Sequence, residues 1–132
     1  MPDTTPGYIT EDNVALFTDL YELTMMQGYH HADHIPEAVF DLFVRDLPAD
    51  RGYLVAAGLE QAVDYIDNLT VTDTAIDYLA AEGFDDDFLD YLAGFEFTGD
   101  IRAVPEGTPV FPDEPLIEVE APIIQAQLLE TM

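Results

Sequence analysis

The chain has 132 residues, of which 48% are hydrophobic, so it is long enough for one domain that buries about 65–70% of its unfolded surface, and this composition argues against disorder. It carries 28 acidic residues against three arginines, with a net charge of −25, which argues against a nucleic-acid partner because phosphate contacts draw on Lys and Arg. The absence of cysteine excludes disulfides and thiolate metal sites, and no signal peptide or membrane span is evident, so we expect a cytoplasmic protein with no membrane partner.

The first predicted helix follows a lead of residues 1–13, which two prolines and a glycine make flexible. Apolar residues recur at helical spacing through residues 15–29, and Asp19 and Glu22 have the spacing of a capping box. We therefore predict a helix that begins at Asp19 and ends at Gly28, where a left-handed residue can stop it.

The first turn of this helix contains a candidate binding site. Asp19 and Tyr21 lie there, beside free backbone N–H groups and the positive end of the helix dipole. An anionic or aromatic ligand could bind at such a place. The alternative is ordinary helix architecture, in which Asp19 caps the helix and Tyr21 is buried in the core.

Three histidines follow, His30, His31 and His34, with Asp33 and Glu37 close by. This composition could bind zinc or nickel. The H-H-x-x-H spacing matches no recognised structural site, however, so we favour a solvated helix end where imidazoles interact with the C-terminal dipole, and we expect no metal site.

A strand and a longer helix are predicted next. Residues 39–45 alternate as a strand does and end at Arg45. With so few basic residues, Arg45 is a candidate for contact with an anionic ligand, and a structural ion pair is the alternative. A helix is then predicted from Leu54 to Asp67. Its apolar face is expected in the core and comprises Val55, Leu59, Ala62, Val63 and Ile66.

Two shorter helices are expected after residue 71. The first is capped near Thr72 or Asp73 and ends at Gly83, and the second begins in residues 85–87 and ends at Gly94. Their inward side chains are expected to be Ile76, Leu79, Ala80, Phe88, Leu89 and Leu92. The three consecutive aspartates at residues 85–87 suggest a magnesium site by composition, but acids at a helix start explain them better.

From Phe95 onward the pattern has the period of two that strands show. Four short strands are expected at residues 95–97, 101–104, 109–111 and 116–119, divided by tight turns. Biotinyl and lipoyl carrier domains also have such layers, but they require a lysine, which this chain lacks. Pro122 then leads into a helix with Ile124 and Leu128 inward; it reaches Met132 without a stop signal, so we expect the intact protein to continue.

Three stretches resemble one enzyme family, in the same order. They are TDLYELTMMQGY (residues 18–29), FDLFVRDLPADRGYLVAAGLEQAVDYI (residues 40–66) and FTGDIRAVPEGTPVFPDEPLIEVEAPIIQAQLLET (residues 97–131). The family is that of the nicotinate phosphoribosyltransferases, which the first stretch resembles more closely than it does the related nicotinamide and quinolinate enzymes. The resemblance implies an α+β fold, with helices plus a small, mostly antiparallel sheet. This hammerhead-like domain would span residues 14–122, and residues 123–132 would begin the helix that leads into an absent α/β barrel.

The resemblance also implies a chemistry. The family condenses nicotinate with phosphoribosyl pyrophosphate to make nicotinate mononucleotide and pyrophosphate in NAD biosynthesis, with Mg²⁺ and with ATP hydrolysis through a phosphohistidine. Asp19 and Tyr21 match residues that approach the pyridine ring from the neighbouring subunit of a homodimer, and Arg45 matches an arginine that reaches phosphate of the sugar substrate. Thr18 is expected to support the turn. No histidine here matches the phosphohistidine, so the isolated chain is expected to contain no catalytic residue, to bind no cofactor and to be inactive.

The acidic composition indicates a habitat. At molar salt the Debye length falls to about 3 Å, which screens the repulsion between so many acids. We therefore expect a halophilic, haloarchaeal source. The alternative from a different functional class is a non-catalytic acidic interaction module that pairs with a separate barrel subunit.

Overall fold

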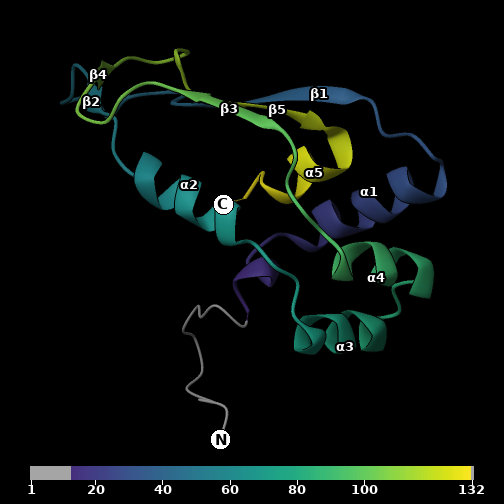
Figure 1. Cartoon of the computed structure of the whole chain (residues 1–132). Coiled ribbons are helices and arrows are strands. Elements are labelled where there is room, and N and C mark those ends of the chain that lie inside the picture. Colours follow the sequence, from purple (N-terminus) through teal and green to yellow (C-terminus); the bar gives the residue numbers. More distant parts are fainter. Residues whose placement is uncertain (1–12, 132) are drawn as a thin grey trace, which may run out of the picture.

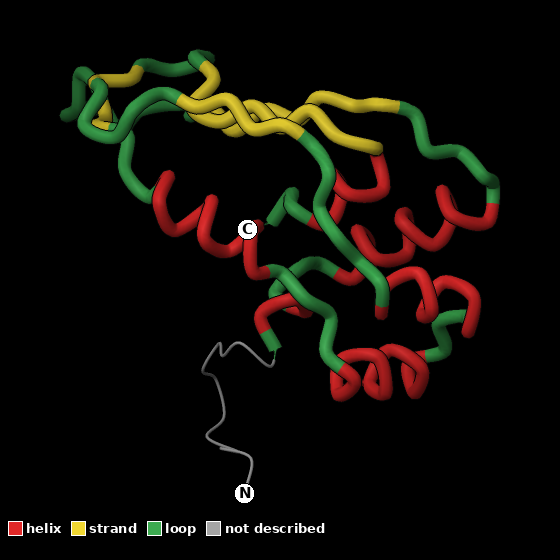
Figure 2. The backbone as a smooth tube through the Cα atoms, in the orientation of Figure 1, coloured by secondary structure: helices red, strands yellow, loops and turns green. Residues whose placement is uncertain are grey.

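A three-stranded antiparallel sheet forms one layer of the molecule, and helices cover one of its faces (Figures 1 and 2). The computed structural model describes residues 13–131. The sheet has the order β1-β5-β3. Its strands are β1 (Glu37–Phe43), β3 (Asp100–Ala103) and β5 (Pro115–Pro122). The central strand β5 pairs with both neighbours, so Val119 lies opposite Phe40 of β1 and Ile101 of β3.

Two further strands pair away from this sheet. They are β2 (Leu54–Val55) and β4 (Pro109–Val110), which form a separate two-stranded antiparallel ribbon. The mixture of helices with small antiparallel sheets confirms the predicted fold class.

Four of the helices contact one another in series, beginning with the helix that packs on the sheet. The described helices are η1 (Val14–Leu16), α1 (Leu20–His31), α2 (Leu59–Asn68), α3 (Asp73–Glu82), α4 (Asp86–Ala93) and α5 (Ile123–Leu128). Helix α5 packs against β1, β5 and α1; α1 contacts α4, and α4 packs on α3. None of these helices is both long and apolar enough to cross a membrane.

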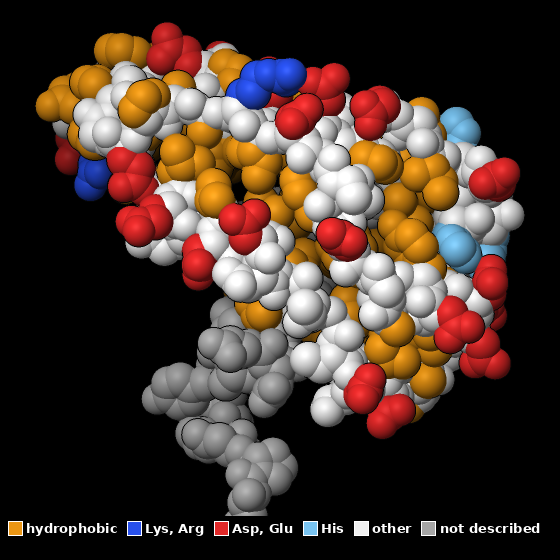
Figure 3. Space-filling model, in the orientation of Figure 1, with side chains coloured by type: hydrophobic (Ala, Val, Ile, Leu, Met, Phe, Trp, Pro, Cys, Tyr) orange, Lys and Arg blue, Asp and Glu red, His pale blue; other side chains and the backbone are white. Residues whose placement is uncertain are grey.

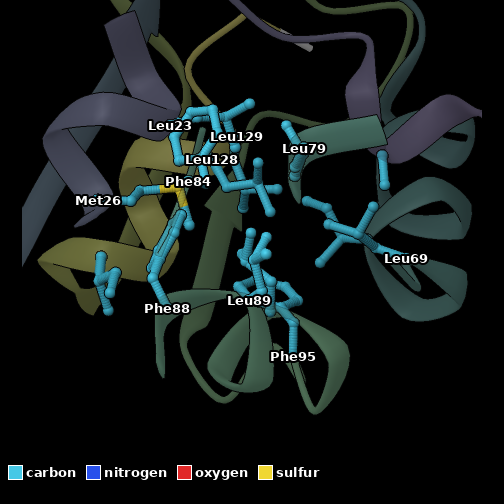
Figure 4. Close-up of a cluster of buried hydrophobic side chains, with 14 residues drawn as sticks. Leu23, Met26, Leu69, Leu79, Phe84, Phe88, Leu89, Phe95, Leu128 and Leu129 are labelled. Atoms are coloured by element: carbon cyan, nitrogen blue, oxygen red, sulfur yellow. The ribbon is translucent and has the colours of Figure 1, made fainter. Parts of the chain in front are cut away.

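The main hydrophobic core lies among these helices (Figure 4). Its fully buried members come from helices far apart in the sequence: Met26 from α1, Leu79 from α3, Phe88 from α4 and Leu128 from α5. The core therefore joins α1 to α5, which lie at opposite ends of the described sequence, because burying apolar side chains from both helices stabilises their contact.

Local sequence signals explain α3 and α4 well. The Thr72 side chain accepts a hydrogen bond from the Ala75 N–H at 3.3 Å, and Gly83 ends α3 in the left-handed conformation. Helix α4 lies between Asp85 and Gly94, as predicted. One detail is wrong, since Ala80 is exposed rather than directed inward.

The predicted start of α2 at Leu54 is wrong. Leu54 and Val55 belong to strand β2, and the helix begins only at Leu59, after Gly58 in the left-handed conformation. The side chain of Glu106 accepts hydrogen bonds from the N–H groups of Gly58, at 2.8 Å, and Glu60, at 3.3 Å. The first turn of α2 is thus capped by a residue distant in sequence, which a local pattern does not reveal.

The predicted core face of α2 is also only partly buried. Ile66 is buried, Leu59 and Ala62 are half-buried, and Val63 is exposed. Val55, which is not in the helix, is exposed as well.

Two other predicted boundaries differ from the structure. Helix α1 continues through Gly28 to His31, and the left-handed residue that follows is Asp33. Strand β1 ends at Phe43, because the register shifts after Leu42 and the next residues contact the turn at residue 113 instead of β5.

Residues 95–97 form no strand. Phe95 is buried in the core, so this segment packs on the helices rather than pairing with the sheet. Helix α5 begins immediately after Pro122, as predicted, with Ile124 and Leu128 buried. The proposed lead at residues 1–13 lies outside the described residues except for Asn13, and the division at residue 122 stays a prediction.

Candidate functional site

The beginning of α1 is less completely capped than the sequence suggests. Asp19 occupies the N-cap position, but its side chain makes no capping hydrogen bond. The expected capping box therefore lacks its Asp19 half. The carboxyl of buried Glu22 accepts a hydrogen bond from Thr131 after α5, and a hydrogen bond with the Asp19 backbone also lowers its pKa. Asp19 is exposed, and its carboxylate is available at the end of the helix where the dipole is positive.

Tyr21 lies on the surface and is 46% exposed, so the interpretation of this residue as a buried core tyrosine is wrong. Its hydroxyl donates a hydrogen bond of 2.5 Å to Oε1 of Glu130. This bond, together with desolvation and nearby acids, raises the pKa of Tyr21 to about 12. The phenol therefore remains protonated at neutral pH and presents a flat, uncharged ring.

Glu130 belongs to a set of polar contacts between α1 and the end of α5, which we name the α1–α5 polar cluster. Its members are Tyr21, Glu22, Gln127, Glu130 and Thr131. The second oxygen of Glu130, Oε2, accepts a 2.5 Å hydrogen bond from Nε2 of Gln127. The hydroxyl of Thr131 donates to Oε1 of Glu22 at 2.5 Å. Two side-chain hydrogen bonds thus join the first turn of α1 to residues 130 and 131.

Two buried oxygens beside this cluster make no hydrogen bond within the described residues. They are Oε2 of Glu22 and Oγ1 of Thr18. Burial is the main cause that raises the pKa of Glu22. The Thr18 hydroxyl therefore makes no hydrogen bond to a described residue that would support the turn, and its predicted role stays a prediction.

Apolar side chains surround the beginning of α1 on the surface. Phe17 and Leu20 are both more than half exposed and lie beside Asp19 and Tyr21. Large exposed apolar side chains next to a half-exposed tyrosine form a surface that suits a flat ligand or a partner protein.

A shallow apolar groove of about 130 Å³ lies between α2 and the sheet (Figure 3). Leu59 and Val63 of α2 face Phe40 and Leu42 of β1 across it. Glu130, which accepts the hydrogen bond from Tyr21, also lines the groove.

Arg45 follows β1 and is exposed, without a hydrogen bond or ion pair to any described residue. The Arg51 guanidinium likewise has no hydrogen bond or ion pair to a described residue, whereas that of Arg102 pairs with Glu118 at 3.0 Å and Glu120 at 2.8 Å. An unpaired guanidinium in so acidic a chain favours the ligand-contact interpretation of Arg45 over a structural pair. No hydrogen bond or ion pair within residues 13–131 joins Arg45 to Asp19 or Tyr21.

The histidines connect two helices. His30 and His31 at the end of α1 lie 3.0 Å from carboxylate oxygens of Asp87 and Asp85 at the beginning of α4. The His30 ring also lies 5.2 Å from that of Tyr91. Within the described residues no group of three potential ligands is placed to hold a metal ion.

Sequence reasoning missed Gln127, Glu130 and Thr131. One local signal was available for the first of these, because Gln127 is a polar residue between Ala126 and Leu128 in an otherwise apolar run. A polar side chain at such a position is buried and needs a partner. Nothing in the local sequence indicates that Gln127 bonds to Glu130, or that Glu130 in turn bonds to Tyr21, which is 109 residues away.

Comparison with known proteins identifies this arrangement. Residues 16–132 match the family model of the nicotinate phosphoribosyltransferase (NAPRTase) N-terminal domain. The chain belongs to this family. The match begins just before α1 and continues through α5, so it includes every contact of the α1–α5 polar cluster.

Individual members of the NAPRTase family are similar over most of this chain. Nicotinate phosphoribosyltransferase pncB2 of Mycobacterium tuberculosis is 49% identical over 118 residues, which cover 89% of this chain and 26% of the relative. The Bacillus subtilis nicotinate phosphoribosyltransferase is 45% identical over 123 residues, which cover 92% of this chain and 25% of that protein.

The structural comparison agrees. The crystal structure of human nicotinic acid phosphoribosyltransferase superimposes with a TM-score of 0.78 at 35% identity, over 86% of this chain and 24% of that one. The chain thus spans about a quarter of the length of the relatives that it matches.

Proposed function

We propose that this chain is the N-terminal part of a nicotinate phosphoribosyltransferase, which makes nicotinate mononucleotide and pyrophosphate from nicotinate and phosphoribosyl pyrophosphate in NAD biosynthesis. The observation that carries the proposal is the family match over residues 16–132. The exposure of Tyr21 and Asp19 at the beginning of α1 supports it, because residues that contact a substrate must be accessible.

The described side chains suit a positioning role in this reaction. As pyrophosphate leaves, the ribosyl carbon gains positive character, so the pyridine nitrogen must be aligned with it and water must be excluded. Tyr21 offers a flat wall for the pyridine ring, and Asp19 offers a carboxylate that can orient polar neighbours. Arg45 offers a guanidinium fork for phosphate oxygens.

Magnesium and ATP belong to the proposal for the longer enzyme. Magnesium there would neutralise pyrophosphate charge. We assign neither Mg²⁺ nor ATP to side chains of this chain. We further propose a cytoplasmic homodimer whose active sites contain residues of both subunits, with the exposed apolar residues at the beginning of α1 directed toward the neighbouring subunit.

A halophilic, haloarchaeal source is part of the same proposal. Acidic side chains are spread over the visible face of the molecule rather than gathered in one patch (Figure 3). The net charge of −25 supports the proposal, because such a charge opposes folding unless salt screens it.

The test of the proposed function is steady-state kinetics on the full-length enzyme with nicotinate, nicotinamide and quinolinate as alternative substrates. Replacing Tyr21 by Ala should lower kcat/KM for nicotinate by about 10- to 100-fold, the equivalent of an aromatic contact and its buried area. Arg45→Ala should lower kcat/KM for phosphoribosyl pyrophosphate by a similar factor, because a hydrogen bond to a charged group is lost. Arg102→Ala is the matched control, since this arginine is already paired with Glu118 and Glu120.

The shared active site can be tested by mixing. A dimer inactivated at Tyr21 and a dimer inactivated in the remaining part of the enzyme should regain partial activity when their subunits exchange. Turnover of nicotinamide or quinolinate in preference to nicotinate would replace the proposed substrate, and no turnover of any of the three would contradict the proposed function.

A further inference from the structure

The two carboxylate oxygens of Glu130 are both occupied, each by a donor from a different helix. Oε1 accepts the hydroxyl of Tyr21 from α1, and Oε2 accepts the amide of Gln127 from α5. Gln127 is only 2% exposed, so its amide is held by the packing around it. Glu130 is itself exposed, yet it is oriented by a buried residue one turn earlier in the chain.

Tyr21 depends on this contact for its orientation. Its ring is 46% exposed and makes no ring-to-ring contact with the described aromatic residues. A half-exposed side chain with free rotation loses rotamer entropy when a ligand stacks on it, and prior orientation removes part of that cost. The hydroxyl bond to Glu130 is the one specific polar contact that holds the Tyr21 side chain in the described part of the chain.

The hydrogen bond between Thr131 and Glu22 also helps to place Glu130. Thr131 donates to buried Glu22, so consecutive residues on α1 bond to consecutive residues after α5. These two hydrogen bonds fix the position of residues 130 and 131 relative to the first turn of α1. The carboxylate of Glu130 is therefore held opposite the Tyr21 hydroxyl by two independent contacts, one to Gln127 and one through Thr131.

We propose that Glu130 is a positioning residue for Tyr21, and that Gln127 orients Glu130 so that the Tyr21 ring is presented for stacking against the pyridine substrate. This inference rests on the proposed function for its substrate, and on the α1–α5 polar cluster for its geometry. Glu130 acts through Tyr21 and does not itself touch the reacting atoms.

The first experiment tests the contact without using activity. The tyrosines are labelled with ¹³C at Cζ, and NMR spectra are recorded up to about pH 11. The Tyr21 signal is identified by its loss in Tyr21→Phe. It should remain that of a protonated phenol in the wild type, because the Glu130 bond is the largest of the causes that raise the Tyr21 pKa to about 12. It should titrate at a lower pH in Glu130→Ala, where only desolvation and the charges of Glu22 and Asp19 still raise this pKa. Glu96→Ala, which removes an equivalent exposed acid from outside the cluster, should leave the Tyr21 signal unchanged.

The second experiment tests positioning in the full-length enzyme. Glu130→Ala and Tyr21→Phe should each lower kcat/KM for nicotinate by about tenfold, which corresponds to one hydrogen bond. The double variant should be no worse than the more damaged single variant, because both changes remove the same bond. Glu130→Gln retains one acceptor oxygen and should restore part of the activity, and it replaces Glu130→Ala if that variant does not fold.

The outcomes separate the inference from the proposed function. An unchanged Tyr21 titration in Glu130→Ala would overturn the contact, whatever the enzyme does. A shifted titration with wild-type nicotinate kinetics, or additive losses in the double variant, would overturn the positioning role. A wild-type enzyme that turns over no pyridine substrate would overturn the proposed function and the substrate assigned to Tyr21, and the titration would still show whether Glu130 holds the ring.

Discussion

Replacing Gly99 by Ala tests how closely the segment before β3 approaches the central strand. A Cβ atom at residue 99 would lie 2.5 Å from Cβ of Ala121, 2.6 Å from the carbonyl oxygen of Glu120 and 2.7 Å from Cζ of Phe97. Ordinary van der Waals contacts between such atoms are about 3.5–4.0 Å. The Phe97 ring can rotate away, but the two atoms on β5 belong to a strand that is paired on both sides and cannot move alone.

The expected cost is about 2–3 kcal/mol in the free energy of unfolding, toward the upper end for overpacking because two of the three contacts are with a fixed strand. Chemical denaturation of the chain at constant high salt measures it, as a lower denaturant midpoint with an unchanged slope. Gly28→Ala is the matched control, because nothing lies within 4 Å of the added Cβ and the residue is inside α1. This control should stabilise the chain by about 0.5–1 kcal/mol.

A Gly99→Ala variant as stable as the wild type would refute the close approach of residue 99 to β5. Equal destabilisation by Gly99→Ala and Gly28→Ala would refute the reasoning from local space, since only one of these sites lacks room for a methyl group.

The remaining predictions concern Glu22, the core and the charge. Burial raises the pKa of Glu22 above its usual 4.5, so the folded state binds this proton more tightly than the unfolded chain does. The stability that this difference in pKa contributes is fully present at pH values below the pKa of Glu22 in the unfolded chain. It is lost as the pH rises through the pKa of Glu22 in the folded state. Glu22→Gln should therefore gain stability relative to wild type as the pH rises above the usual carboxyl pKa of 4.5 in parallel denaturation series, and a pH-independent difference would contradict the buried carboxyl. Phe88→Ala should cost about 3–5 kcal/mol because Phe88 is fully buried in the core, whereas Tyr78→Ala, at a residue 55% exposed, should cost far less in the same assay. Thermal unfolding in decreasing salt should show a falling melting temperature as repulsion among the acids is unscreened, and a constant melting temperature would contradict the halophilic interpretation.

Local interactions explain where sequence reasoning succeeded. Thr72 and Gly83 bound α3 through contacts within one turn of the chain, and the apolar spacing of α4 and α5 follows from which side must face a core. The first turn of α1, which the sequence suggested as a site from Asp19 and Tyr21, is exposed, although the Asp19 side chain does not cap the helix, and its role stays a prediction.

The errors have a common physical origin in contacts between distant segments. Glu106 caps α2 and β4 pairs with β2, so the chain before Leu59 is not helical despite its apolar spacing. Phe95 lies in the core, so its segment does not pair as a strand.

The sequence by itself determined the number and kind of most elements, the acidic surface and the family, because periodicity, caps and motifs are properties of neighbouring residues. Only the tertiary structure decided that Tyr21 is exposed, that Glu22 is buried and that Glu130 joins Tyr21 to Gln127. These facts depend on the packing of α5 against α1, which brings together residues 109 positions apart, and no local pattern encodes such a contact.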